Sequence, residues 1–298
     1  MSAIMPFARA FIAFLTIPLF AASLDSGIHQ TIAPFEGTVY LYAKNLDTGK
    51  TYGLRENERV RTASTIKLGI MAGLFAEVAA GHVKLTDEIT LHDADKVSGS
   101  GIINQLSDGV QLPVRDVMRL MIELSDNTAT NLILDRIGAD AVNAELDRLG
   151  LKQIRSMRKV RGDGNDLKPP TGWSAAGRLP ENQRFGIGAG TPREMVLLLE
   201  EIEKGEVVSP AASKEMIEVL KHQQDQDGIR RELQNLPIAN KTGSLDALRS
   251  DVGIVYSPNG RIAMAITCEN IAKPDYGPDN PGAILIGKLA VLLVDGLK

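Results

Sequence analysis

Apolar residues recur at strand spacing near both ends of the chain and at helical spacing between them. Residues 37–43 and 51–54, separated by the turn-forming triplet Asp-Thr-Gly, predict a β-hairpin. Residues 250–256 and 261–268 flank an Asn-Gly pair, which is a strong signal for a second hairpin. Residues 238–244 indicate a further strand. The two ends of the chain therefore predict a largely antiparallel sheet.

The middle of the chain predicts helices, whose limits are marked by Pro113, Gly81, Gly138 and Gly150. We expect helices over residues 64 to about 80, 113–124, 128–137 and 140–149, and a last apolar helix over 283–297 that covers the sheet. This pattern predicts an α/β (α+β) fold, an antiparallel sheet flanked by helices with an inserted all-helical lobe. We expect one catalytic domain over residues 24–298, with the sheet from 37–60 and 236–298 and the helical lobe from roughly 61–205.

The first 23 residues differ from the rest of the chain. Arg9 precedes an apolar run of about 13 residues, which ends in the small residues Ala21, Ala22 and Ser23. This order is typical of a secretory signal, and the run is shorter than the roughly 20 residues of a membrane-spanning helix. We therefore predict that residues 1–23 are a cleaved signal peptide and that the mature protein is secreted or periplasmic, without a stable membrane anchor. An uncleaved anchor is the alternative.

The composition is that of an ordinary globular protein. Of the 298 residues, 44% are hydrophobic and 23% charged, and the formal net charge is −4. No basic stripe with interleaved aromatic residues occurs, so we expect a small-molecule partner and no nucleic acid. Cys268 is the only cysteine, which excludes an intrachain disulfide, and we expect it to be a small buried hydrophobic residue. We expect a monomer.

Ser64-Thr65-Ile66-Lys67 opens the first predicted helix, which is apolar around most of its circumference and should be buried. Residues three apart share a helix face, so the Lys67 amine should lie within reach of the Ser64 hydroxyl. A lysine can take the proton of a serine only if burial lowers its pKa. The alternative is a capping serine followed by an exposed lysine, because this spacing arises by chance about once in a chain of this length. Ser156 and Lys159 form such a second copy, which we interpret as accidental.

Two further triplets carry candidate chemistry. Ser125-Asp126-Asn127 follows an apolar helix, where Ser125 could relay a proton to a leaving group and Asn127 could hold a substrate carbonyl. Its alternative is a cap for the next helix. Lys241-Thr242-Gly243 lies on a predicted strand, where glycine lets a ligand approach the backbone closely. Its alternative is an exposed strand with a bend.

The three motifs occur in one order, on a helix start, a helix-to-helix turn and a strand, and in this combination the sequence resembles the class A β-lactamases and penicillin-binding proteins. The resemblance covers nearly the whole predicted mature chain, is densest over residues 99–150, and includes Thr-Pro-Arg-Glu at 191–194.

The resemblance implies an acyl-enzyme mechanism in which Ser64 attacks a carbonyl carbon, Lys67 is a candidate base, and Ser125 with Lys241 protonates the departing nitrogen. The backbone amides of Ser64 and Ser244 would form the oxyanion hole. The substrate carboxylate would be held by Lys241, Thr242 and, by a weaker assignment, Arg249. We also expect burial and the charge of Lys241 to lower the pKa of Lys67.

One departure from the family concerns the loop that activates the deacylating water. Hydrolytic class A enzymes carry Glu-x-x-Leu-Asn there, and residues 161–170 and 179–182 lack that pattern. Asp163, Asp166 and Glu181 are possible substitutes, but we interpret each as a solvated loop carboxylate. The sequence therefore predicts acylation of Ser64 followed by slow release.

The leading hypothesis is a serine β-lactamase, with the role in antibiotic resistance that this implies. A D-alanyl-D-alanine peptidase or esterase with the same machinery is one alternative, and a penicillin-binding sensor that acylates without turnover is another. The four histidines are scattered without the close spacing of metal ligands, so we expect no metal and no cofactor.

Overall fold

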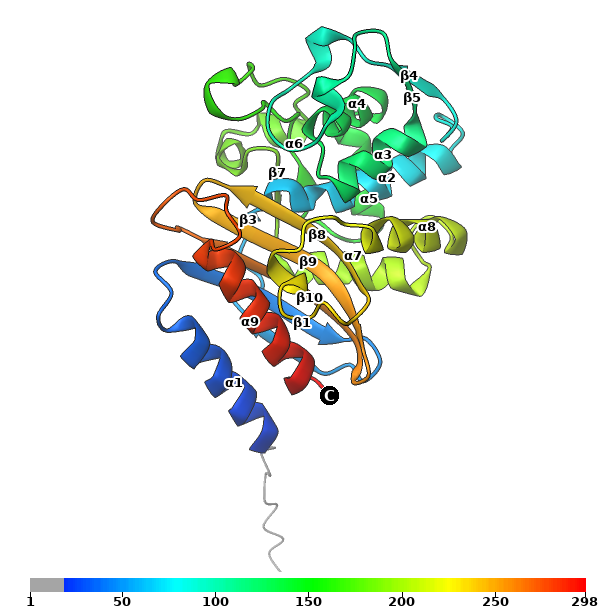
Figure 1. The fold of residues 1–298 in the computed structure, drawn as a ribbon. Helices are drawn as coiled ribbons and strands as arrows, with labels where there is room; N and C mark the ends of the chain where they lie inside the picture. The colour runs from blue at the N-terminus through cyan, green and yellow to red at the C-terminus, as the bar shows by residue number, and fades with distance from the viewer. Residues whose placement is uncertain (1–18) are drawn as a thin grey trace, which may run out of the picture.

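The computed structural model describes residues 19–298 and contains a five-stranded antiparallel sheet with helices on both faces (Figure 1). The strand order is β2-β1-β10-β9-β8, with β1 at Thr38–Asn45, β2 at Thr51–Leu54, β8 at Ile238–Leu245, β9 at Leu248–Ser257 and β10 at Gly260–Glu269. Both predicted hairpins are present, and the N-terminal pair lies beside β10, from the C-terminal part of the chain. The predicted fold class is confirmed.

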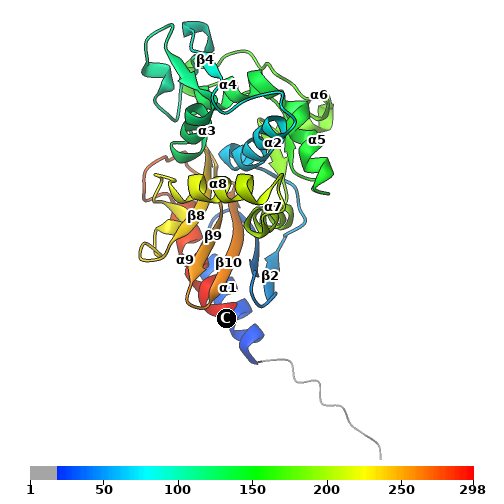
Figure 2. The same cartoon turned by 90° about the vertical axis from the view of Figure 1, so that its right-hand side faces the viewer.

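Strand β10 runs through the middle of the sheet and is buried on both faces. Ile262, Met264 and Ile266 point toward one core, which they share with α1 (Leu19–Ile32) and α9 (Pro281–Gly296). Ala263 and Ala265 point toward the other core, because successive side chains of a strand face opposite sides. Helices α7 (Pro192–Lys204) and α8 (Pro210–Lys221) pack against that second face. Figure 2 shows the two helical layers from the side.

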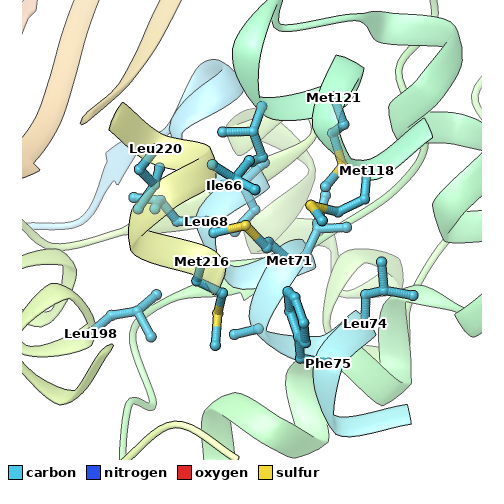
Figure 3. Close-up of a cluster of buried hydrophobic side chains, with 14 of the residues drawn as sticks. Ile66, Leu68, Met71, Leu74, Phe75, Met118, Met121, Leu198, Met216 and Leu220 are labelled. Atoms are coloured by element: carbon cyan, nitrogen blue, oxygen red, sulfur yellow. The ribbon is translucent and has the colours of Figure 1, made fainter. Parts of the chain in front are cut away.

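The helical lobe is built around α2, Lys67–Ala79. Its apolar side chains are buried by neighbouring helices, with Met118 and Met121 reaching in from α3 and Met216 and Leu220 from α8 (Figure 3). The other lobe helices are α3 (Val114–Glu123), α4 (Asn127–Ile137), α5 (Ala139–Arg148) and the short α6 (Ala175–Arg178). The expectation that the Ser64 helix is buried is confirmed, because an all-round apolar helix must be covered on every side.

Short elements complete the lobe and border the site. One small sheet has the strand order β3 (Val60–Arg61), β7 (Gly188–Gly190) and β6 (Arg155–Ser156). A second small sheet pairs β4 (Glu88–Thr90) with β5 (Gln111–Pro113). The 3-10 helices are η1 (Ala63–Ile66), η2 (Asp93–Asp95), η3 (Ile103–Gln105), η4 (Gly164–Asp166), η5 (Pro180–Phe185) and η6 (Gly228–Arg230).

Helices α7 and α8 were not predicted, although their starts are marked in the sequence. Thr191 and Ser209 cap them by accepting hydrogen bonds from backbone amides, and each cap is followed by proline. The predicted lobe range of 61–205 includes α7, which packs against β1 and β10 of the sheet. The reason is that α7 carries an apolar stripe that matches the sheet face opposite α9.

The predicted signal peptide lies outside the residues whose side chains are described, and the first described buried side chains of α1 are Leu24 and Ile28. Across residues 19–298, the helices are too short or too polar to cross a membrane. Cys268 is buried as expected, and burial raises the pKa of its thiol.

Candidate active site

Ser64 lies in the 3-10 turn η1, directly before α2, and lines a cavity of about 590 Å³. The sequence predicted an α-helix from residue 64, but the α-helix begins at Lys67. Ala63, which also lines the cavity, has a φ of 46°. A non-glycine residue in this region costs about 1–3 kcal/mol, and such conformations occur where surrounding structure imposes them at functional sites. The turn presents Ser64 at the cavity while the following helix is buried.

Lys67 is fully buried beneath this cavity. Its Nζ donates hydrogen bonds to the backbone carbonyl oxygen of Ser125 at 2.7 Å, to Ser125 Oγ at 3.2 Å and to Asn127 Oδ1 at 3.2 Å. Among the described residues none of its acceptors is Ser64, so the expected direct pairing with the Ser64 hydroxyl is not present in this structure. Burial, and secondly the charge of Lys241, hold the pKa of Lys67 well below its usual value. The direction agrees with the expectation, and Lys67 is linked to Ser125 instead.

In the Ser125-Asp126-Asn127 triplet, the middle residue stabilises the fold and the two outer residues line the cavity. Asp126 caps α4 by accepting from the backbone amide of Ala129 at 2.8 Å, and its second carboxylate oxygen accepts from the amide of Ile103 at 2.8 Å. Ser125 and Asn127 both line the cavity, and Ser125 has a φ of 55°. The capping alternative therefore describes Asp126, and that cap holds the strained Ser125 in place.

Asn127 is held from two sides. Its side-chain nitrogen donates to the carbonyl oxygen of Ser98 at 3.1 Å, while its oxygen accepts from Lys67. The amide predicted to hold a substrate carbonyl is thus oriented by the protein itself.

Strand β8 forms the facing side of the cavity through Thr242, Gly243 and Ser244. A Cβ atom on Gly243 would lie 2.8 Å from the carbonyl oxygen of Thr62 and 3.1 Å from the backbone nitrogen of Ser64. Glycine here therefore lets the strand approach the protein's own η1 backbone, whereas the sequence suggested room for a ligand. This contact places Ser64 and Ser244 on the lining of one cavity.

Lys241 is fully buried, and its Nζ donates to the carbonyl oxygen of Thr242 at 2.8 Å. Burial lowers the pKa of Lys241 to about 8, while the carboxylates of Asp225 and Asp251 act in the opposite direction. We call Thr242, Gly243 and Ser244 the β8 wall of the cavity. Lys241 therefore contributes positive charge behind the β8 wall, near enough to Lys67 to lower the pKa of that group.

Arg249 does not line the Ser64 cavity. Its guanidinium donates to the backbone carbonyl oxygens of Leu245 and Leu248, at 2.6 and 2.7 Å, and to that of Asp275, and it lies 4.8 Å from the ring centre of Tyr276. It borders a small cavity of about 70 Å³ that shares Thr242, Gly243 and Ser244 with the Ser64 cavity. The weaker assignment of Arg249 to a substrate carboxylate therefore stays a prediction.

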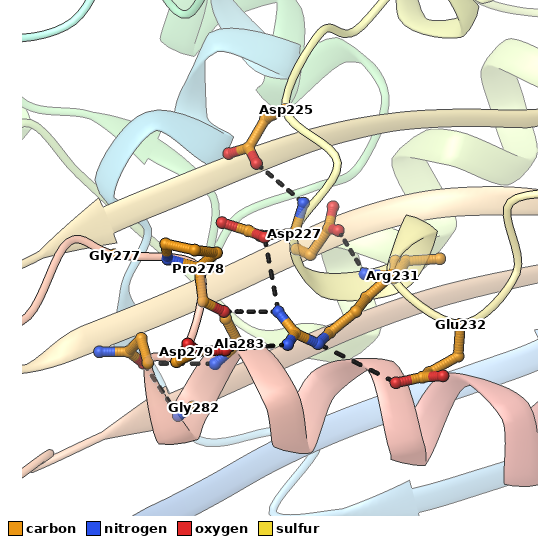
Figure 4. A network of polar contacts seen from close by, with 12 residues as sticks. Asp225, Asp227, Arg231, Glu232, Gly277, Pro278, Asp279, Gly282 and Ala283 are labelled. Atoms are coloured by element: carbon orange, nitrogen blue, oxygen red, sulfur yellow. Dashed lines mark hydrogen bonds and ion pairs between the residues drawn. The ribbon is translucent and has the colours of Figure 1, made fainter.

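Asp225 and Tyr276 also line the Ser64 cavity, and neither was predicted from the sequence. A polar network joins the loops that carry them (Figure 4), with Asp225 accepting from the amide of Asp227 at 3.0 Å. Arg231 then bridges Asp227 at 3.6 Å and Asp279 at 3.3 Å. These loops are far apart in sequence, so no local pattern could have grouped them.

Of the three loop carboxylates considered for water activation, only Asp163 lines the cavity. Asp163 is exposed, and its backbone amide donates to Ser98 Oγ at 2.9 Å. Asp166 and Glu181 lie elsewhere on the surface. The second serine–lysine copy is structural, because Lys159 Nζ pairs with Asp135 and Ser156 is buried in β6.

Comparison with known proteins adds to this geometry. A family model described as the beta-lactamase enzyme family matches residues 23–297. Beta-lactamase L2 of Stenotrophomonas maltophilia is 28% identical over 228 residues, which cover 74% of this chain and 70% of the relative.

Solved structures align over nearly the whole chain. A beta-lactamase from Sphaerobacter thermophilus has a TM-score of 0.79 at 30% identity, covering 93% of this chain and 97% of that one. The structure of PBP-A has a TM-score of 0.74 at 26% identity, covering 92% and 95%. A PBP-A mutant in an acyl-enzyme complex with penicillin G aligns with the same TM-score of 0.74 and identity of 26%, covering 92% of this chain and 96% of that one.

Proposed function

The chain belongs to the beta-lactamase enzyme family, and from that premise we propose that it opens β-lactam rings by forming an acyl-enzyme on Ser64. The observation that carries the proposal is the fully buried Lys67, bonded to Ser125 at the cavity that Ser64 lines. In its neutral form, Lys67 Nζ donates at most two of its three hydrogen bonds and keeps a lone pair that can accept a proton. Burial and the charge of Lys241 favour that neutral form.

In the proposed first step, Ser64 Oγ attacks the carbonyl carbon of the lactam and its proton passes to Lys67. This transfer requires the two side chains to come into hydrogen-bond contact when substrate binds. The link from Lys67 to Ser125 supports a route onward, in which Ser125 Oγ donates its proton to the lactam nitrogen as the carbon–nitrogen bond breaks, and takes one from Lys67. The product is an ester of Ser64 with the ring opened. This route uses Ser125 as the relay between base and leaving group.

In this proposal, the β8 wall binds the charged parts of the substrate. The backbone amides of Ser64 and Ser244 are the proposed donors to the carbonyl oxygen as negative charge develops, an interaction commonly worth about 3 kcal/mol. The carboxylate of the substrate would accept from Thr242 and be attracted by the buried charge of Lys241. Asn127 Nδ2 donates one of its two hydrogens to Ser98, and the other would donate to the acyl side-chain amide oxygen.

The second step, hydrolysis of the ester, lacks a comparable arrangement. The cavity carries Asp163 and Asp225 as its carboxylates and no glutamate among the described residues. General-base help is worth about 10²–10⁴ in rate, so we propose that acylation outpaces release. This observation favours a second candidate function, a penicillin-binding protein with a long-lived acyl-enzyme or with D-alanyl-D-alanine peptidase activity.

Stopped-flow mixing with a chromogenic cephalosporin tests the proposal. We expect a burst equal to the enzyme concentration, then slow turnover, with intact-mass and peptide mapping locating the adduct on Ser64. Ser64→Ala should remove both burst and adduct, while Ser156→Ala, at the second serine–lysine copy, should retain them. An adduct that persists in Ser64→Ala would contradict the assignment of the nucleophile. Release of D-alanine from a D-Ala-D-Ala peptide, faster than β-lactam turnover, would favour the second candidate.

The N-terminal prediction extends the proposal to location. We propose that residues 1–23 direct export, so that the enzyme meets β-lactams outside the cytoplasm and protects its host from them. Terminal sequencing of the exported protein should find Ser23 or Leu24 first. An exported protein that begins at Met1 would contradict it.

A further inference from the structure

The cavity that Ser64 lines is rich in arginine. Its lining includes Arg61, Arg158, Arg161 and Arg184. Arg158 and Arg161 follow β6, and Arg184 belongs to η5, so these three come from the segment between β6 and β7. We call Arg158, Arg161 and Arg184 the arginine wall. The β8 wall with Thr242 belongs to a different part of the chain.

The three residues of the arginine wall lack carboxylate partners. Arg61 pairs with Glu269 at 3.1 Å, but within residues 19–298 no salt bridge involves Arg158, Arg161 or Arg184. Nη1 of Arg158 donates to the carbonyl oxygen of Lys159 at 2.8 Å, and Nε of Arg161 donates to that of Lys168 at 2.7 Å. These bonds leave most of each guanidinium's five donors free.

Two aromatic rings hold the wall in position. The guanidinium of Arg184 lies 4.2 Å from the ring centre of Phe185, and that of Arg158 lies 5.6 Å from the ring of Trp173. Phe185 is buried, so it is a fixed platform for Arg184. Arg231, by comparison, pairs with Asp227 and Asp279.

Charge accumulates there at an energetic cost. Burial, and secondly the positive charge of Arg161, lower the pKa of the Arg158 guanidinium, yet arginine stays protonated at physiological pH. The acids of the same cavity, Asp163 and Asp225, do not pair with the wall. An anion bound between the guanidinium groups would relieve the repulsion and use their free donors.

We propose that the arginine wall is a subsite for a second anionic group, a carboxylate on the acyl side chain of the substrate. The inference rests on the proposed function, because the first carboxylate is assigned to Thr242 and Lys241 on the β8 wall. A substrate with carboxylates at both ends satisfies both walls while its reacting carbonyl lies at Ser64. The enzyme should therefore favour dianionic β-lactams over those with neutral or cationic side chains.

Three penicillins that differ at one carbon test this proposal. Benzylpenicillin, carbenicillin and ampicillin carry hydrogen, carboxylate and ammonium at the side-chain α-carbon. The rate constant for acylation of Ser64, followed by intact mass, should be lowest for ampicillin. In the double variant Arg161→Gln/Arg184→Gln, the carbenicillin-to-benzylpenicillin ratio of these rate constants should fall about tenfold, as expected for loss of charged hydrogen bonds. Raised salt should lower the ratio in the wild type only.

Arg178→Gln is the matched control, since Arg178 is exposed on α6 and does not line the cavity. That variant should keep the wild-type ratio. An unchanged ratio in the double variant would overturn the subsite. If no penicillin acylates Ser64, the proposed function fails instead, and calorimetric binding of phenylmalonate against phenylacetate then tests the subsite directly. Stronger phenylmalonate binding that the double variant loses supports it, and equal binding of the two acids overturns it.

Discussion

The two sides of the cavity differ in how completely the protein satisfies its own charged groups. On the helical side, Lys67 Nζ has three hydrogen-bond partners and Asp126 accepts from backbone amides on both of its oxygens. On the loop side, the arginine wall has no carboxylate partner within residues 19–298, and Asp163 is exposed. The difference indicates that the groups proposed for acylation are held in place by the protein, whereas those proposed for substrate choice and acyl release are left open to a ligand or solvent.

Backbone strain also differs between the helical side and the loop side of the cavity. Ala63 and Ser125, with φ of 46° and 55°, flank the buried Lys67. The hydrogen bonds of Asp126 and the close contact of Gly243 with η1 hold these conformations against a cost of about 1–3 kcal/mol each. The described loop between β6 and β7 has positive φ values only at glycines, so its shape is less strained.

The largest expected effect comes from replacing the proposed base, Lys67, on the helical side of the cavity. Lys67→Arg should lower the acylation rate by about 10²–10⁴, because a guanidinium stays protonated and cannot accept the serine proton. Adduct formation by intact mass is the measurement, and thermal unfolding verifies that the variant is folded. Lys159→Arg, at the second serine–lysine copy, is the control and should acylate normally. Near wild-type acylation in Lys67→Arg would show that another group is the base.

A change of shape without a change of charge should have the next largest effect. In Gly243→Ala, the new Cβ would lie 2.8 Å from the Thr62 carbonyl oxygen, so η1 must shift away from β8. A misplacement of about 1 Å can cost about 10² in rate, so acylation should slow by about that factor. Gly27→Ala, whose Cβ meets only ordinary contacts at 3.7 Å, is the control. Unchanged acylation in Gly243→Ala would mean that the approach of β8 to Ser64 is not needed.

Neutral replacement of the carboxylates on the loop side of the cavity should affect hydrolysis of the acyl-enzyme more than its formation. We expect Asp163→Asn to slow hydrolysis of the acyl-enzyme about tenfold, less than the 10²–10⁴ of a well-placed base, because Asp163 is exposed. Asp166→Asn and Glu181→Gln should leave the rate unchanged, since neither residue lines the cavity. Single-turnover decay of the adduct measures each rate. A large effect of Glu181→Gln would require the loop to move before deacylation.

The smallest effect should appear as a pH dependence of KM. The pKa of Lys241 is lowered to about 8, so its charge is present below that pH and is lost as pH rises through it. KM for carboxylate-bearing substrates should therefore be nearly constant below about pH 7 and rise about fivefold by about pH 9, the range of a single weakened ion pair. KM for a substrate ester that lacks the carboxylate serves as the control and should not follow this curve. A KM that falls above pH 8 would exclude attraction by Lys241.

Much of the fold could be predicted from local pattern. The hairpins of the sheet and helices α2 to α5 and α9 lie close to their expected positions, because apolar spacing and glycine or proline boundaries act within a few residues. Helices α7 and α8 were missed despite their threonine and serine caps. The apolar faces of these two helices are buried only once the sheet is complete, and three strands of the sheet follow them in the chain.

The sequence by itself determined the family, the fold class and the motifs from Ser64 to Gly243, because these depend on residue type at short spacing. Only the tertiary structure decided that Lys67 bonds to Ser125 instead of Ser64, that Gly243 accommodates η1, and that Arg249 borders a smaller neighbouring cavity. It also decided that Arg158, Arg184 and Asp225 share one cavity with the motifs. The physical reason is that burial, charge pairing and pKa depend on distance in space, and these groups lie on segments that are distant in sequence.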